Sequence, residues 1–312
     1  MEKTTLSTES PTPEELKAMQ ELLQRPQTQQ TSQSGNPLAA YMRTPQIYIK
    51  LPSGGKYYPE GALEMPASGE LPVLPMSTRD ELIIKTPDAL INGQSTVDVI
   101  EHCIPAIKDA WQVPLIDLDY LLISIRIASY GENMDFTSQC PKCEELNEYE
   151  IDLKVFLDQT IDISAYEDSI QYKDLKIKFR PQNYRTLNMN NQEVFEQQRL
   201  FNILNDAEMD SEEKENRYNQ VFKRLTEINV KQIGSMIEYI ETPDGTRVEQ
   251  RAFIDEFIEN ADRKVFDAVE KHSQRIAQGI PEKRLPANCP DCQHSYSTPF
   301  TFDYANFFGT AS

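Results

Sequence analysis

Histidine is scarce in this chain, and the motifs of the common enzyme classes are absent. Only 3 histidines occur among 312 residues, and no HExxH, GxSxG, Walker or GxGxxG pattern can be found. The Gly54-Gly55-Lys56 run has the wrong spacing for a phosphate loop. Acid–base chemistry would rest on carboxylates alone, and 50 acidic residues give no way to choose a pair. Nothing in the sequence favours an enzyme.

Positive charge is also in short supply. The chain has 31 basic residues against 50 acidic ones, a formal net charge of -19. Such a chain repels phosphate backbones and anionic lipids unless a basic patch overrides the repulsion, and its lysines and arginines are scattered among acids. We therefore expect protein partners, with no nucleic acid and no membrane.

Long hydrophobic runs and secretory features are missing as well. The most apolar stretch, residues 118–130, is interrupted by Arg126 and is shorter than the ~20 residues that cross a bilayer. The N-terminus lacks the basic, apolar and small-residue pattern of a secretory signal. These absences predict a soluble intracellular protein, whose 5 cysteines are not expected to form disulfides.

The first segment, residues 1–44, is rich in Thr, Ser, Gln and Pro. This composition cannot offset the entropy of ordering and predicts a disordered tail. Within it, Thr12 as N-cap, Pro13 at the first helical position and Glu15 in a capping box predict a short amphipathic helix over 12–24. We expect either a transient helix or one that folds on a partner, with equal weight on both.

Residues 45–165 are expected to form an α+β core. Alternating apolar residues at 47, 49 and 51 predict a strand. After a second short strand, Ser77 with Asp80 predicts a capped helix. Pro87 is expected to open a short helix that Asn92-Gly93 closes, and Ser95 or Thr96 to cap the next one. The longest apolar helix is expected within 114–131, ended by Gly131.

Residues 166–286 are predicted to be a hairpin followed by a mainly helical insertion. The apolar pattern of 169–181 around a Lys-Asp pair indicates the hairpin. Asp244-Gly245 is a second hairpin signal. The helical periodicity covers the segments 192–206, 211–237, 249–261 and 262–278.

Two C-P-x-C motifs carry the strongest chemical signal. Cys140 and Cys143 stand far along the chain from Cys289 and Cys292. Each motif is typical of a knuckle whose two thiolates bind one metal ion, and two knuckles complete a four-cysteine tetrahedral set. The sequence thus predicts a structural zinc ion in a zinc-ribbon-like pair of knuckles, the second one in residues 287–312 returning to the core.

The long separation of the two motifs does not argue against this site. Loop-closure entropy costs only ~0.6 kcal/mol per doubling of length, so a folded insertion can separate the halves. A redox pair is less favoured, because it does not call for a second copy, and pairing of knuckles between subunits is left open. His294 is an alternative ligand. His102 and Cys103 are expected in the core or at its edge, and His272 is expected to be solvated.

Several segments, in order, resemble the T-even-type bacteriophage baseplate proteins. They are LPSGGKYYP (51–59), LPVLPMSTRDELII (71–84), TVDVIEHCI (96–104), LDYLLISIRIASYG (118–131) and CPKC (140–143). The resemblance covers roughly residues 46–180. It implies a virion or assembly protein of a contractile-tailed phage, made in the host cytoplasm, that acts through contacts with other baseplate and tail proteins.

Three roles follow from these observations. The first is a structural component of the baseplate hub, located in the virion tail, with the zinc site as a clasp between early and late segments. The second is a chaperone that assembles the hub and is absent from finished particles. The third is a zinc-ribbon protein that binds nucleic acid, which the few basic residues near the knuckles disfavour. Homo-oligomer formation is left open.

Overall fold

A computed structural model describes residue 38 and residues 41–84, 93–206 and 211–300, with the backbone alone at 200–206 and 211–214. The chain divides into two compact units, residues 1–42 and 43–312. The helix expected at 12–24 and the short helix expected at Pro87 lie outside the described residues. None of the described helices is long and apolar enough to cross a membrane.

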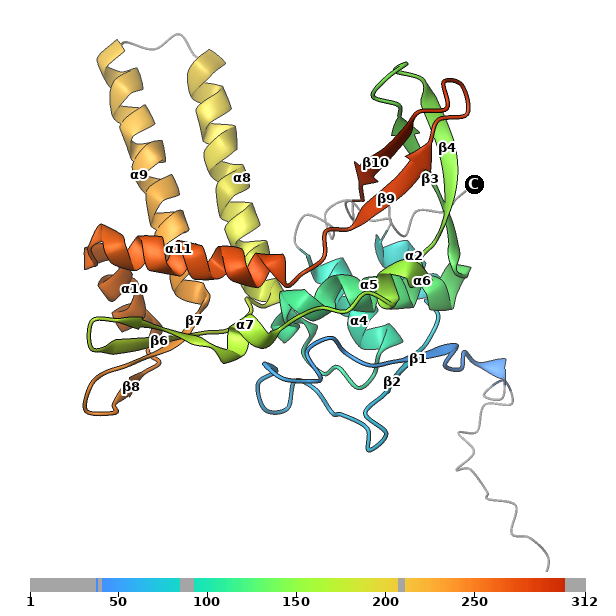
Figure 1. The fold of residues 1–312 in the computed structure, drawn as a ribbon, viewed down its shortest axis with the longest axis horizontal. Helices are drawn as coiled ribbons and strands as arrows, with labels where there is room; N and C mark the ends of the chain where they lie inside the picture. Colours follow the sequence, from blue (N-terminus) through green and yellow to red (C-terminus); the bar gives the residue numbers. More distant parts are fainter. Residues whose placement is uncertain (1–37, 39–40, 85–92, 207–210, 301–312) are drawn as a thin grey trace, which may run out of the picture. The chain divides into compact units, whose positions relative to one another are not determined.

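The second unit combines helices with small antiparallel sheets, which confirms the α+β prediction (Figure 1). Among the described residues, three sheets have two strands each, β1-β2, β3-β4 and β9-β10. The fourth sheet has four strands in the order β5-β6-β7-β8. The strands are β1 (Ile47–Ile49), β2 (Leu71–Val73), β3 (Asn133–Gln139), β4 (Leu146–Asp152), β5 (Ser169–Tyr172), β6 (Leu175–Phe179), β7 (Ile237–Glu241), β8 (Arg247–Val248), β9 (Arg284–Asn288) and β10 (Ser295–Pro299). The helices are α2 (Thr78–Ile84), α4 (Gln94–Cys103), η2 (Ala110–Gln112), α5 (Leu115–Tyr130), α6 (Lys154–Leu157), α7 (Ser164–Glu167), α8 (Tyr184–Asp206), α9 (Ser211–Ser235), α10 (Arg251–Asn260) and α11 (Arg263–Gln278).

Helix α2 begins with the capping box that the sequence predicts. The main-chain N–H of Ser77 donates to Asp80 Oδ2 at 2.8 Å, and that of Asp80 donates to Ser77 Oγ at 3.3 Å. Asp80 is fully buried and also accepts a hydrogen bond from Arg43 Nη1 at 3.1 Å. Burial opposes its ionisation, but the Ser77 and His102 hydrogen bonds and the Arg43 charge lower the pKa of Asp80. This carboxylate therefore ties residue 43 to the core.

Helix α4 starts earlier than expected. The prediction that Ser95 or Thr96 caps this helix is wrong, because the N-cap is Gly93 with a φ of 71°. Both polar residues lie in the first helical turn and are buried. Glycine reaches this left-handed conformation without steric cost, and a Cβ atom at this position would lie 2.8 Å from Asn188 Oδ1. Close approach of α8 therefore requires a glycine here.

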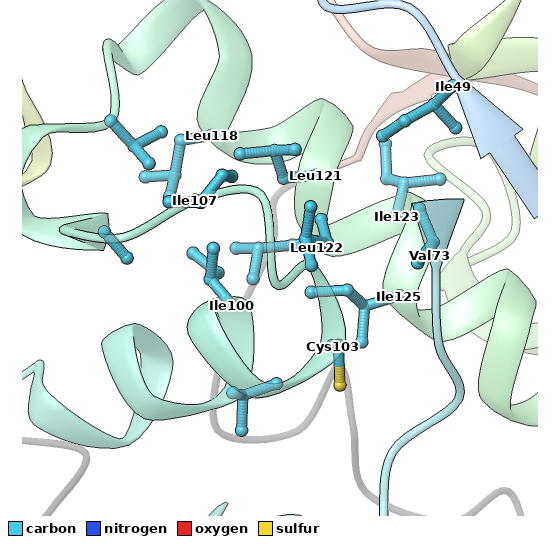
Figure 2. Close-up of a cluster of buried hydrophobic side chains, with 14 of the residues drawn as sticks. Ile49, Val73, Ile100, Cys103, Ile107, Leu118, Leu121, Leu122, Ile123 and Ile125 are labelled. Atoms are coloured by element: carbon cyan, nitrogen blue, oxygen red, sulfur yellow. The ribbon is translucent and has the colours of Figure 1, made fainter. Parts of the chain in front are cut away.

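Helix α5 is the centre of the first apolar cluster. Its predicted end at Gly131 is confirmed, where the backbone turns with a φ of 92°. Its leucines and isoleucines meet side chains from α4 and β2 (Figure 2). Full burial of each such side chain contributes ~1.5–3 kcal/mol. The fully or nearly fully buried members shown are Ile49, Val73, Ile100, Cys103, Ile107, Leu118, Leu121, Leu122, Ile123 and Ile125.

The segment between the two C-P-x-C motifs contains the hairpins and helices that the sequence predicts. Strands β5 and β6 form the first hairpin, and β7 pairs with β8 across the Asp-Gly turn. Strand β6 also pairs with β7, so the α8–α9 helical hairpin is inserted between two neighbouring strands. A second apolar cluster, which includes Phe179, Ile254 and Val269, packs α10 and α11 against this sheet.

His272 is buried, so the prediction that it is solvated is wrong. It lies on the inner face of α11 with 5% of its surface exposed, and its ring centroid is 4.3 Å from that of Phe179. Burial, and then the charge of Arg275, lower the pKa of His272. His272 lies on the same face of α11 as Val265, Val269 and Ile276, which are also buried. The many charged residues of this helix led to the prediction that position 272 is exposed.

Candidate metal centre

Each C-P-x-C motif forms the turn of an antiparallel β-hairpin. The first turn joins β3 to β4, with Gln139 paired to Leu146, and the second joins β9 to β10, with Asn288 paired to Ser295. In both hairpins the first cysteine directly follows the last paired residue of the incoming strand. The strands therefore fix the position of each pair of thiols.

The two turns are closed by equivalent backbone hydrogen bonds. In the first, the N–H of Glu144 donates to the carbonyl of Cys140 and the N–H of Cys140 donates to Glu145, each at 2.9 Å. In the second, Cys289 makes the same two bonds with the residues four and five positions further along, at 2.9 and 3.0 Å. The two halves thus share one local geometry although they are distant in sequence.

A residue in the left-handed conformation follows the second cysteine of each motif. Glu144 has a φ of 63° and Gln293 a φ of 57°. Non-glycine residues take this conformation only where the surrounding structure determines it. Its recurrence at equivalent positions shows that both turns have the same backbone conformation. In each hairpin the two cysteine side chains lie on the side that faces the other hairpin, where the four sulfurs meet.

The four cysteine sulfurs form one compact cluster. The Sγ atoms of Cys140 and Cys292 are 3.7 Å apart and those of Cys143 and Cys289 are 3.5 Å apart, and all four lie within 4.8 Å of one another. A tetrahedral ion with Zn–S bonds of about 2.3 Å requires S···S distances of about 3.8 Å. The spacing therefore fits four thiolates around a single ion.

Ionisation of the thiols is uneven. Burial opposes ionisation of Cys140, but the amides of Cys143 and Lys142 donate to its sulfur and lower its pKa to about 7. At Cys143 the amide of Glu145 favours the thiolate, yet burial and the neighbouring thiols raise the pKa to about 12. The pKa of Cys292 is also raised, although the amide of His294 favours its thiolate. Four adjacent thiolates therefore require a bound cation.

Asn147 contributes a side-chain hydrogen bond to the cluster, and sequence reasoning missed it. It is buried, and its Nδ2 donates to Cys289 Sγ at 3.6 Å and to the carbonyl of Glu145 at 3.3 Å. The preceding residue of β4, Leu146, is 68% exposed. A polar residue next to the C-P-x-C turn was the available signal, since amide donors commonly orient metal-bound thiolates.

His294 takes part through its main chain. Its carbonyl accepts the hydrogen bond of Cys289 that closes the second turn, and its ring stacks on Tyr296 with the centroids 6.2 Å apart. The residues that can hold a metal together in the described part of the chain are the four cysteines. His102 lies at the core edge beside Asp80, and Cys103 is buried, both as predicted.

The second hairpin is also held by contacts that involve no cysteine. Leu285 is buried in the first apolar cluster, and Phe300 stacks on Phe156 with the ring centroids 4.9 Å apart. The hydroxyl groups of Tyr149 and Tyr296 are 3.2 Å apart across the two hairpins. Further support comes from an ion pair between Lys283 and Asp119.

The donor set determines what this centre can do. Four thiolates fill a tetrahedral coordination shell and leave no position for a substrate or water. Zinc and iron are the metals that such an arrangement selects. The centre is thus suited to fastening two segments of chain, with the ion as a cross-link.

Comparison with known proteins gives one result. The model of the family described as T4 bacteriophage base plate protein matches residues 43–309, which includes both C-P-x-C motifs. No curated protein and no solved structure matches the chain.

Proposed function

Because the chain belongs to the T4 bacteriophage base plate protein family, we propose that it is a structural component of the baseplate of a contractile-tailed phage, located in the hub region of the virion tail. It is assembled in the host cytoplasm and acts through contacts with other baseplate and tail proteins. The family match supports the baseplate role. The finer location is supported by the resemblance of residues 46–180 to the T-even-type baseplate proteins, one of whose members belongs to the central hub.

The four cysteines hold a zinc ion that clasps the late hairpin to the early one. The observation that carries this proposal is the single cluster formed by sulfurs 146 residues apart along the chain. Structural zinc binds with an apparent free energy of ~10–16 kcal/mol, which is as large as the ~5–15 kcal/mol that stabilises a typical fold. Loss of one ligand should therefore release the clasp.

Metal content and unfolding of single-cysteine variants test the clasp. Elemental analysis by inductively coupled plasma mass spectrometry should find one zinc ion per chain in the purified wild-type protein. Cys143→Ser should lose the zinc and melt at a lower temperature. Cys103→Ser is the matched control, because Cys103 is buried outside the cluster. Full zinc content in Cys143→Ser with an unchanged melting temperature would refute the clasp.

Quantitative mass spectrometry of purified particles tests the hub role. A structural component should be present in a fixed whole-number ratio to the tail-tube and baseplate proteins. Its absence from particles, combined with abundance in infected-cell lysate, would identify an assembly chaperone instead. Cross-linking within the particle would then show whether its neighbours are hub proteins or peripheral baseplate proteins.

A further inference from the structure

Helices α8 and α9 form an antiparallel hairpin with few other contacts (Figure 1). At its base, α8 contacts η2, and α9 contacts α10 and β7. Beyond this base the two described helices pack on each other. Two helices alone cannot bury a large apolar surface. The side chains on their outer faces therefore indicate whether each face is exposed to solvent or contacts a partner.

One face of this hairpin carries charges that are paired with each other. Arg224 on α9 forms an ion pair with Glu193 on α8, and its Nη1 lies 2.9 Å from Glu227 Oε2. This contact also shows that residues 193 and 224 lie at the same level of the antiparallel pair. A face of this kind is typical of solvent exposure.

The opposite face carries two phenylalanines at one level. Phe195 lies two residues after Glu193, and Phe222 lies two residues before Arg224. Two residues correspond to about 200° around a helix, so both rings project from the face opposite the ion pair. Phe195 is 60% exposed and Phe222 is 57% exposed. An aromatic pair is thus presented on the outside of the hairpin.

The residues that share a helix face with this pair are rich in amides and include no carboxylate. Residues three and four positions away on a helix share a face, and among these neighbours only Arg199 is charged. The neighbours are Asn191, Gln192, Gln198 and Arg199 on α8, and Tyr218, Asn219, Leu225 and Thr226 on α9. In a chain with a net charge of -19, this acid-free aromatic face resembles the centre of a protein interface.

We propose that this face, defined by Phe195 and Phe222 and their eight neighbours, is a contact surface for a second copy of the same chain, which packs α8–α9 against α8–α9 as a four-helix bundle. A two-fold contact requires a surface complementary to itself. Asn and Gln amides both donate and accept hydrogen bonds, and phenyl rings pack against phenyl rings. The absence of carboxylates lets two acidic chains approach here without the repulsion that acts elsewhere.

The size of the face sets the expected affinity. Its ten residues are fewer than the ~20–30 per side of a standard interface. Association of the free chain should therefore be weak, with a Kd of ~10 µM to 1 mM. The contact does not depend on the hub location or on the zinc clasp, because its residues lie outside both.

Analytical ultracentrifugation of the full chain from about 10 to about 500 µM, a range set by the expected affinity, tests this contact. The weight-average mass of the wild type should rise with concentration from 35.9 kDa towards twice that value. The double variant Phe195→Gln/Phe222→Gln should stay monomeric while keeping its circular dichroism spectrum. Met189→Gln is the control, because Met189 is 62% exposed on α8 but lies on another side of that helix.

Three results would overturn the proposal. They are a wild type that remains monomeric throughout the range, a double variant that associates as the wild type does, and a Met189→Gln variant that loses association equally. Salt gives an independent readout. Because the face has no ion pairs to screen, the association should not weaken between low and high salt, and a marked weakening would also contradict it.

Discussion

The carboxylate of Asp117 accepts a hydrogen bond from the hydroxyl of Ser53 at 2.5 Å. The same carboxylate accepts the main-chain N–H of Ser53 at 2.8 Å and the hydroxyl of Tyr58 at 3.1 Å. Asp117 lies in the first turn of α5 and is fully buried. It therefore fixes both ends of the glycine-containing loop at 53–58 on the central helix of the core.

Replacing Asp117 by Asn should change the pH dependence of stability. Burial raises the pKa of Asp117 to about 6, although the Ser53 and Tyr58 hydrogen bonds oppose the shift. The unfolded chain has the lower value of about 3.9, so this group stabilises the fold at low pH and loses that contribution as the pH rises through about 6. The advantage of wild type over Asp117→Asn in urea unfolding should shrink from pH 4 to pH 7. A constant difference would contradict this, and Asp174→Asn in the exposed β5–β6 turn is the control.

His272 should produce the opposite trend. Its pKa is lowered in the folded chain, so protonation favours unfolding, and stability should fall as the pH drops through the unfolded value of about 6.5. Among the described residues its Nε2 has no hydrogen-bond partner, so the polar contact that His272→Leu removes there is the one between the ring and the backbone of Ala165. The melting temperature of His272→Leu should fall less than that of the wild type between pH 7.5 and pH 5.5. Equal losses would show that other groups cause the acid sensitivity.

Gly93→Ala should destabilise the contact between α4 and α8. A left-handed φ costs a non-glycine residue ~1–2 kcal/mol, and the added Cβ would also lie 2.8 Å from Asn188 Oδ1. Gly61→Ala separates the two effects, because Gly61 has a φ of 81° and no atom of the described residues lies within 4 Å of the added Cβ. In denaturant unfolding, Gly93→Ala should lose at least ~1 kcal/mol more than Gly61→Ala. Equal losses would mean that Asn188 moves aside freely.

Asn147→Leu should weaken metal binding without removing a ligand. Loss of an outer hydrogen bond to a coordinating residue typically costs ~10–100-fold in affinity, and Asn147 donates to Cys289 Sγ. Transfer of the metal to a competing chelator should occur at a correspondingly lower chelator concentration. Thr137→Val, on the exposed face of β3, is the control and should retain the affinity of the wild type. An unchanged affinity in Asn147→Leu would leave this hydrogen bond without a role at the metal.

Local signals in the sequence predicted most elements correctly. The Ser77–Asp80 capping box, the end of α5 at Gly131 and the hairpin at Asp244-Gly245 each depend on residues a few positions apart. The convergence of the four cysteines was also predicted, because few residue types bind metals so specifically. The division of residues 45–312 into core, insertion and returning knuckle stays a prediction.

The errors arise where distant contacts outweigh local preference. Ser95 and Thr96 are good capping residues, but the approach of Asn188 selects Gly93 as the N-cap. His272 occurs among charged residues, yet the sheet beneath α11 buries it. Asn147 is buried and donates to Cys289 Sγ, which lies 142 positions further along the chain. None of these contacts is visible from a short window of sequence.

The separation of the two C-P-x-C turns has a consequence for the order of events during synthesis. Cys289 leaves the ribosome 146 positions after Cys143, at a synthesis rate of ~5–20 residues per second. The whole insertion is therefore available to fold before the four-cysteine centre can close. A chain truncated between the two motifs keeps only Cys140 and Cys143, so the four-cysteine cluster can form only in a chain that contains the second motif as well.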